Sequence, residues 1–538
     1  MSIDKVFGID LGTTYSCIAQ MDRFGRPEVI SNMDGDNTTP SVVQFQGDDV
    51  VVGKLAKRSA RIDPDNVAQL VKRHMGDTAW RFHAGGREWS APAVSALILG
   101  ALVKDAERAT GEQVKDVVIT VPAYFGTEVR EQTKLAGELA GLNVLDIINE
   151  PTAAAYSYGF AQDGSANETI LVYDLGGGTF DTTIIALGSG NIRVVATDGD
   201  HELGGANWDA ELAGLLAERF LSAQPQASDP FDDVYSEADL VTQAEEVKQS
   251  LTQRETAEVL VVSGADRASV SVTRGDFEEV TRSLMDRTIE LTRRTVDAAA
   301  REGVTQIDRV LLVGGSSKMP AVARRLKEAF GYDGQLADPD LAVAKGAALF
   351  GQKLMLERTV EEATGRGVDL TKAMADAAAA HGMTSEAVKS VVETQIVNVC
   401  SRGFGVVAQR DNVDTAIFLV HQNDAVPVQV EETFYTMVDD QSLISVEVFE
   451  QGGSEESESP ADNNVLIRGQ ITDLPPGYPQ GTAVTVRMQM GRDGILTVTA
   501  HHAGQLQPLT LQVDTTSSMT PEQIAAERSA VSLHKKNL

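Results

Sequence analysis

Two segments of this 538-residue chain repeat one pattern: an apolar strand that ends in an aspartate and continues into a glycine turn. The first is GIDLGTTYS at residues 8–16, and the second is YDLGGGTFD at residues 173–181. Glycine has no Cβ, so backbone N–H groups in such turns can approach phosphate oxygens, and threonine hydroxyls add further donors. One glycine turn usually only joins two strands. Two matched copies predict a phosphate clamp formed by Gly12, Thr13, Thr14, Gly176, Gly177, Gly178 and Thr179.

Aspartates accompany both glycine turns. Asp10 and Asp174 end the two apolar strands, where they are expected to face a cation between the turns, and Asp181 closes the second motif. Mg²⁺ keeps several of its waters when only a few carboxylates hold it. The three carboxylates therefore predict a hydrated Mg²⁺ site. The alternative for Asp181 is an ordinary turn aspartate.

Two further glycine pairs occur in the same half of the chain. Gly314 and Gly315 lie in LLVGGSSKMP, between an apolar strand and a helix that is expected to begin near Pro320. Their backbone donors suit an anion, or the ribose and base of a nucleotide, although a purely structural turn is the alternative. Gly204 and Gly205 form the other pair, in HELGGANWD.

Length, charge and cysteine content limit the class of protein. The chain is too long for one core and predicts three or four folding units. A formal net charge of -32 argues against a nucleic-acid partner. The sequence has no apolar run of about 18 residues and begins directly with a strand, so we expect no membrane association and a cytoplasmic location. Cys17 and Cys400 are too few for a disulfide framework and are interpreted as packing residues.

The hydrophobic pattern divides the chain. Residues 1–355 alternate strands with helices, as in α/β domains, whereas residues 398–515 alternate polar and apolar positions and carry an Asp493-Gly494 hairpin signal. Residues 356–397 form a helical linker segment with helices expected at 369–382 and 384–395, followed by residues 396–399. Residues 516–538 predict one short helix that opens with a capping box at Thr520.

Seven motifs resemble the 70-kilodalton heat-shock chaperone family, the DnaK-like proteins. In order they are GIDLGTTYSC, VVITVPAYF, IINEPTAAAYSYG, YDLGGGTFD, HELGGANWD, LLVGGSSKMP and DPDLAVAKGAA. The resemblance covers residues 1 to about 350 strongly, and the β unit less specifically. It implies an α/β fold class: an actin-like two-lobed ATPase domain, followed by a β-sandwich peptide-binding-like domain. The implied cofactors are ATP or ADP, Mg²⁺ and K⁺.

The resemblance also assigns roles to individual residues. It makes Lys72 the catalytic lysine, and Glu150 the acid that helps to place the metal and the attacking water, beside Asp174, Thr179 and Asp181. Arg73 would stack near adenine. Lys318 stands where the family usually has arginine, so adenine stacking and nucleotide affinity should be weaker. The other implied nucleotide contacts are Tyr15, Glu245, Lys248, Thr252, Ser316 and Asp340, and the residues that relay nucleotide state are Pro122 and Arg130.

The β unit is expected to bind peptide. Phe434, Met437 and Ile444 fall where the family lines its peptide cleft, and Val406 is a fourth candidate; the alternative is that all four fill the sandwich core. The family's leucine-rich, acidic-ended linker is absent, so we expect altered coupling between the domains. The stretch after Thr520 is also too short for the family's helical lid.

The leading hypothesis is an ATP-dependent chaperone that binds extended hydrophobic segments of unfolded polypeptides, with a J-domain co-chaperone and a nucleotide-exchange factor as further partners. One alternative is a weakly hydrolysing, nucleotide-bound regulatory or scaffolding protein that recruits partners through its β domain. A small-molecule kinase with the actin-like fold is disfavoured, because the motifs of Lys72 and Glu150 and the β domain would have no role in it.

Overall fold

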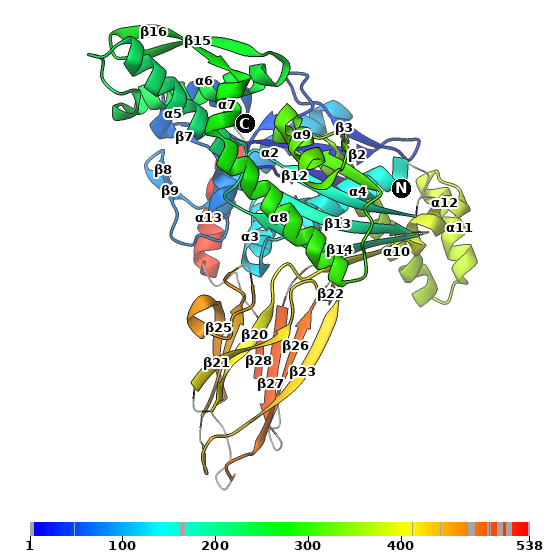
Figure 1. Ribbon diagram of the computed structural model, residues 1–538. Coiled ribbons are helices and arrows are strands. Elements are labelled where there is room, and N and C mark those ends of the chain that lie inside the picture. Colours follow the sequence, from blue (N-terminus) through cyan, green and yellow to red (C-terminus); the bar gives the residue numbers. More distant parts are fainter. Residues whose placement is uncertain are drawn as a thin grey trace.

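The computed structural model describes residues 5–47, 49–161, 167–188, 190–411, 413–441, 443–453, 455–471, 479–491, 494, 496–502, 509–512 and 519–535. Figure 1 shows two α/β lobes with a β domain projecting below them. Each lobe is built around one sheet. The first sheet has the order β11-β10-β1-β2-β3, formed by β1 (Val6–Asp10), β2 (Tyr15–Met21), β3 (Pro27–Ile30), β10 (Asp116–Val121) and β11 (Asn143–Asn149). Short β4 (Thr39–Pro40) pairs with β2.

The second sheet repeats the strand order of the first. It runs β18-β17-β12-β13-β14, formed by β12 (Glu168–Leu175), β13 (Phe180–Gly188), β14 (Asn191–Asp200), β17 (Arg309–Val313) and β18 (Gly334–Leu336). In both sheets the strand that ends in the motif aspartate has an antiparallel neighbour on one side and a parallel neighbour on the other. The repeated motif is therefore part of a repeated lobe.

Helices cover these sheets and join the lobes. Their bounds in the first lobe are α1 (Lys54–Ser59), α2 (Ala91–Thr110), α3 (Thr127–Leu139) and α4 (Glu150–Ala161), and in the second lobe α5 (Gly205–Ala223), α6 (Val234–Gln253), α7 (Arg274–Val280), α8 (Arg282–Arg301) and α9 (Pro320–Phe330). The remaining small strands are β5 (Val43–Gln46), β6 (Asp49–Val52), β7 (Val67–Ala68), β8 (Phe82–Ala84), β9 (Arg87–Trp89), β15 (Thr256–Ser263) and β16 (Asp266–Thr273).

One capping prediction is wrong. The sequence from Thr127 to Gly141 predicts a helix with a capping threonine and a terminating glycine, but Gly126 is the N-cap residue of this helix, α3, and provides no side-chain cap. Thr127 is the first helical residue, and its hydroxyl donates instead to the carbonyl oxygen of Gly494 at 3.2 Å. Because Gly494 belongs to the β domain, the Thr127 hydroxyl forms an interdomain hydrogen bond instead of capping the helix.

The helical segment lies against the two α/β lobes. Helix α10 (Ala342–Gly365) continues through residue 355, where the domain was expected to end, and α11 (Leu370–His381) and α12 (Ser385–Glu393) pack on it. Buried Lys353 of α10 donates to the carbonyl oxygen of Val392 near the end of α12, at 3.2 Å. The next strand, β19 (Gln395–Val399), pairs in parallel with β14. The segment after the helical pair is therefore part of the second lobe's sheet.

Two four-stranded sheets form the β domain. One has the order β21-β20-β24-β25, and the other β23-β26-β27-β28. Their strands are β20 (Phe404–Arg410), β21 (Val413–Val420), β23 (Val428–Tyr435), β24 (Ile444–Glu450), β25 (Asn464–Ile471), β26 (Ala483–Met490), β27 (Leu496–His502) and β28 (Leu509–Gln512). β26 and β27 pair as the hairpin signal predicts, although Asp493 itself lies outside the described residues. Short β22 (Ala425–Val426) joins β19.

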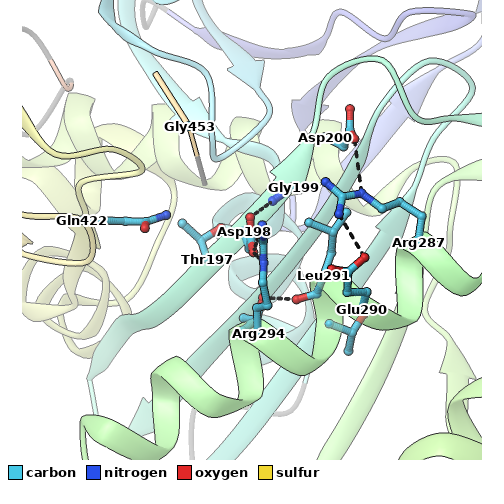
Figure 2. A network of polar contacts seen from close by, with 12 residues as sticks. Thr197, Asp198, Gly199, Asp200, Arg287, Glu290, Leu291, Arg294, Gln422 and Gly453 are labelled. Carbon is cyan, nitrogen blue, oxygen red and sulfur yellow. Dashed lines mark hydrogen bonds and ion pairs between the residues drawn. The ribbon is translucent and has the colours of Figure 1, made fainter. Parts of the chain in front are cut away.

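The β domain contacts strand β14 of the second lobe. The backbone N–H of Thr197 on β14 donates to Oδ1 of Asn423 at 3.2 Å. Figure 2 shows this part of β14 with Gln422 of the β domain nearby. There, Asp198 pairs with Arg294 of α8 at 2.7 Å. This ion pair ties β14 to α8 beside the interdomain contact.

Helix α13 (Pro521–Lys535) packs on the first lobe (Figure 1). Its predicted capping box is confirmed, because Thr520 N–H donates to Gln523 Oε1 at 2.7 Å and Gln523 N–H donates to Thr520 Oγ1 at 3.3 Å. Ser90, the N-cap of α2, donates to Glu527 Oε2 at 2.8 Å. Across the described part of the chain, every helix is too short or too polar to cross a bilayer.

Candidate functional site

A cleft of about 930 Å³ lies between the two lobes. It is lined by most of the residues that the sequence predicts for nucleotide binding: Asp10, Gly12, Thr13, Thr14, Tyr15, Lys72, Arg73, Glu150, Asp174, Gly176, Gly177, Thr179, Glu245, Lys248, Thr252, Gly314, Gly315, Ser316, Lys318 and Asp340. Four predicted residues lie behind this lining: Gly178, Asp181, Gly204 and Gly205. The tertiary fold thus gathers segments that are up to 330 residues apart in sequence, counting from Asp10 to Asp340.

The two copies of the motif face each other. A Cβ on Gly177 would overlap the side chain of Thr14, and a Cβ on Gly178 would overlap that of Thr13. The glycines are therefore needed for the close approach of the lobes as well as for the turn.

Several glycine N–H groups are already used within the protein. Gly176 N–H donates to Thr179 O at 3.0 Å, Gly205 N–H to Gly176 O at 3.0 Å, and Gly314 N–H to Pro339 O at 2.8 Å. These three N–H groups hold the turns together, and contact of Gly176 and Gly314 with the nucleotide stays a prediction. At Gly314 the backbone also has a φ of 79°, which a residue with a Cβ rarely adopts.

A buried ion pair lies at the base of the cleft. Lys72 comes from the 3₁₀ turn Val71–His74, and Glu150 is the first residue of α4. Their Nζ and Oε1 atoms are 2.6 Å apart, and both side chains are buried. A charge-assisted bond in such surroundings has a defined geometry and little screening by water.

Three aspartates surround this pair: Asp174 and Asp181 are buried, and Asp10 is half-buried. Burial, and then repulsion from Glu150, raise the pKa values of Asp10, Asp174 and Asp181 well above the ordinary aspartate value, and Lys72 only partly offsets this. Asp181 Oδ1 accepts the Ala123 N–H at 3.0 Å, whereas its Oδ2 has no hydrogen-bond partner among the described residues. A bound cation would favour the ionised form of these carboxyls and offset the cost of burying their charge.

The donor set fits a hydrated Mg²⁺. Within the described ranges, no three His, Cys, Asp or Glu side chains come close enough to hold a metal ion directly. Mg²⁺ commonly keeps several waters and is held through one or two carboxylates together with phosphate oxygens. Asp10, Asp174 and Asp181 therefore suit an ion bound largely through water.

Arg73 and Lys248 make contacts that the sequence did not predict. Arg73 donates to the Gly178 carbonyl oxygen at 2.9 Å and to Asn207 Oδ1 at 2.7 Å, so it ties the first lobe to the second. Lys248 forms a buried pair with Asp209 Oδ2 at 2.7 Å. Asp209 was missed, although it ends the quoted motif HELGGANWD. Adenine stacking by Arg73 stays a prediction.

A second cross-lobe pair closes the mouth of the cleft. Lys57 of α1 donates to Glu245 Oε1 of α6 at 2.7 Å and to the Tyr15 hydroxyl at 3.0 Å. Glu245 was predicted to contact adenosine, and here its carboxylate accepts from Lys57 as well as lining the cleft. Opening the lobes would break this pair.

We expect Lys57→Ala to release ADP faster by about twofold to fivefold, because half-buried ion pairs contribute up to about 1 kcal/mol. Stopped-flow displacement of a fluorescent ADP analogue would measure the rate. Lys54→Ala is the matched control, since Lys54 lies on the same helix but pairs with Asp36 at 3.1 Å within the first lobe. Equal release rates for the two variants would contradict a closing role for Lys57.

Comparisons with known proteins agree with this geometry. The family described as "Hsp70 protein" matches residues 6–364 and again residues 353–537. The chain is 35% identical over 534 residues to the "Chaperone protein DnaK" of Halobacterium salinarum, in strains ATCC 29341 / DSM 671 / R1 and ATCC 700922 / JCM 11081 / NRC-1. These alignments cover 97% of this chain and 77% of each relative. With matches of this extent and two repeated lobes that enclose a cleft, the chain belongs to the Hsp70 family.

Proposed function

We propose that ATP is hydrolysed between the two lobes at Lys72 and Glu150, and that nucleotide state controls peptide binding in the β sandwich. As an Hsp70 family member the chain is an ATP-dependent chaperone and an ATPase, and it binds ATP or ADP with Mg²⁺. The observation that supports the catalytic assignment is the buried Lys72–Glu150 pair, at 2.6 Å and beside buried Asp174 and Asp181.

Catalysis of phosphoryl transfer consists mostly of positioning and electrostatic stabilisation. In our proposal the Lys72 ammonium donates to a phosphate oxygen, and the Glu150 carboxylate orients the attacking water. The hydroxyls of Thr13, Thr14 and Thr179 donate to the phosphates from opposite lobes. When bound, Mg²⁺ would neutralise phosphate charge, and Asp10, Asp174 and Asp181 would hold its waters.

The steady-state ATPase rate with and without an extended apolar peptide tests this function. We expect hydrolysis that requires Mg²⁺ and rises with peptide. Binding of ATP and peptide without measurable turnover would favour the alternative of a weakly hydrolysing scaffolding protein. No contact in the described residues specifically supports that alternative.

The four predicted peptide-binding residues differ in accessibility. Val406 is 3% exposed and lies within the sandwich core, as the core-filling alternative predicted for it. Phe434 and Ile444 are half-buried at the edge of this core. Met437 is 41% exposed, next to exposed Tyr435. We therefore propose that Met437, with Phe434 and Ile444, forms the peptide-binding surface.

We expect Met437→Asp to weaken binding of an apolar peptide by about tenfold, because a carboxylate replaces an apolar contact of about 1.4 kcal/mol or more. Fluorescence anisotropy with a labelled peptide measures the affinity. Val406→Ala is the comparison, since a truncation in the core should lower thermal stability and leave the affinity of the folded protein nearly unchanged. If Val406→Ala weakens peptide binding and Met437→Asp does not, then Val406 rather than Met437 belongs to the peptide-binding surface.

Finer assignments rest on the resemblance alone. They include adenosine contacts by Glu245, Lys248, Thr252 and Lys318, a bound K⁺, a J-domain co-chaperone, a nucleotide-exchange factor and a cytoplasmic location. For Lys318 the structure adds an ion pair with Asp340.

A further inference from the structure

One carboxyl group of the β domain is buried against a helix of the ATPase domain. Glu450 ends strand β24 and is only 8% exposed. A Cβ placed on Gly126, the N-cap of α3, would lie 2.5 Å from Glu450 Oε1 and 2.9 Å from Oε2. Gly126 has a φ of -67°, which suits any residue. The need for glycine here therefore comes from the Glu450 carboxyl and not from the backbone.

Glu450 occupies the place of a helix cap. The first N–H groups of a helix have no partners within the helix and carry partial positive charge. Gly126 offers no capping side chain, and the Glu450 carboxyl lies directly against Gly126 at this end of the helix, where the Thr127 N–H lowers the pKa of Glu450 and so favours its ionised form. Glu450 Oε1 has no hydrogen-bond partner within the part of the chain that the structure describes. A carboxyl group from a different domain thus faces the start of α3.

The first turn of α3 is also connected by hydrogen bonds to residues next to Glu150 and Asp181. Arg130, one turn along α3, donates to Asn149 Oδ1 at 2.6 Å, and Asn149 precedes Glu150. Arg130 also donates to the Ala123 carbonyl oxygen at 3.2 Å. The Ala123 N–H in turn holds Asp181 Oδ1 at 3.0 Å. A movement of the first turn of α3 would therefore shift the positions of both Glu150 and Asp181.

We propose that Glu450 is a positioning residue for ATP hydrolysis, because its carboxyl caps α3 only while the β domain is docked, and so couples docking to the placement of Glu150 and Asp181. The proposal rests on the catalytic role proposed for Lys72 and Glu150. It also makes docking dependent on the protonation of Glu450.

The sign of that dependence follows from the surroundings of Glu450. Burial raises its pKa above the ordinary 4.5, and Glu128 of α3 adds to this, whereas Arg402, Arg130 and the Thr127 N–H act in the opposite direction. A carboxyl with a raised pKa in the docked state binds its proton more tightly there than in the undocked state. Docking should therefore be strongest at low pH and weaken as pH rises through the docked value.

The first test is a double-mutant cycle in the full-length chain. Gly126→Ala should lose about fivefold or more of the peptide stimulation of ATPase, the size of a typical coupling energy. Glu450→Ala should lose the stimulation to a similar extent, and Gly126→Ala combined with Glu450→Ala should lose little more than either single variant, because both changes remove the same contact. Gly214→Ala is the control, since a Cβ on Gly214 would meet open space. Full stimulation in Gly126→Ala or in Glu450→Ala, or an additive loss in the double variant, would overturn the proposal.

The second test uses pH and hydrogen exchange. In the wild type, the ratio of stimulated to basal ATPase should fall as pH rises. Glu450→Gln keeps the shape of the side chain but does not titrate, so this ratio should fall less steeply in the variant. Glu432→Gln, an exposed change in the same domain, should retain the wild-type profile. Amides 127–130 should exchange faster in Gly126→Ala than in wild type. Identical pH profiles for Glu450→Gln and wild type would reject the coupling role.

The two proposals fail in different ways. If Lys72→Ala still hydrolyses ATP, the catalytic assignment is wrong, whatever Gly126→Ala does. If Lys72→Ala is inactive while Gly126→Ala keeps its stimulation and its slow amide exchange, only the role of Glu450 is wrong.

Discussion

Replacing Lys72 by alanine is expected to lower single-turnover ATP hydrolysis by about 10²-fold to 10³-fold while ATP binding persists. A group that acts mainly on developing charge in the transition state contributes about 3–4 kcal/mol. Lys72 fits this role, because its ammonium is buried in the cleft and fixed by Glu150 at 2.6 Å. Quenched-flow measurement of ADP formation under single-turnover conditions gives the rate, and titration with a fluorescent ATP analogue gives the affinity.

Two further variants separate chemistry from folding. Lys72→Ala leaves Glu150 buried without its cation, and breaking a buried pair in this way costs about 3–5 kcal/mol of stability. Lys72→Ala with Glu150→Gln removes the uncompensated charge and should recover stability but not hydrolysis. Lys115→Ala, at an exposed position, should retain both. Undiminished single-turnover hydrolysis in Lys72→Ala would show that the ammonium has no catalytic role.

Gly346→Ala is expected to destabilise the ATPase domain by about 3 kcal/mol or more, an effect as large as those of the most severe core substitutions. Gly346 lies on α10 where it crosses α4, and a Cβ there would overlap the carbonyl oxygen of Ala153. Backbone cannot move aside as a side-chain end can, so the two helices would have to separate. Because α4 begins at Glu150, nucleotide binding should weaken as well.

Thermal and urea unfolding followed by circular dichroism would measure this loss. The control is Gly214→Ala, in the exposed middle of α5, which should gain up to about 1 kcal/mol because alanine is the better helix former. A Gly346→Ala protein with wild-type stability would mean that the α4–α10 crossing is looser than the coordinates indicate.

Local sequence patterns predicted many of the elements. Asp369 and Gly382 bound α11, and Thr520 starts α13, because caps and turns depend on residues adjacent in sequence. The same logic failed at Thr127. The Thr127 hydroxyl donates to the carbonyl oxygen of Gly494, and Gly126, which has no side chain, is the N-cap residue. Rules based on neighbouring residues in sequence cannot predict a hydrogen bond to another domain.

The sequence by itself determined the repeated strand-turn motif, the chemistry of the cleft and the family. These depend on residue types at short spacing, and short segments contain all of that information. The tertiary structure alone decided that Thr13 and Thr14 meet Gly178 and Gly177, that Lys57 pairs with Glu245, and that the Glu450 carboxyl lies against Gly126 at the start of α3. Each of these contacts joins residues far apart in the chain. They depend on how lobes and domains pack, because burial and close approach are properties of the assembled fold rather than of any segment.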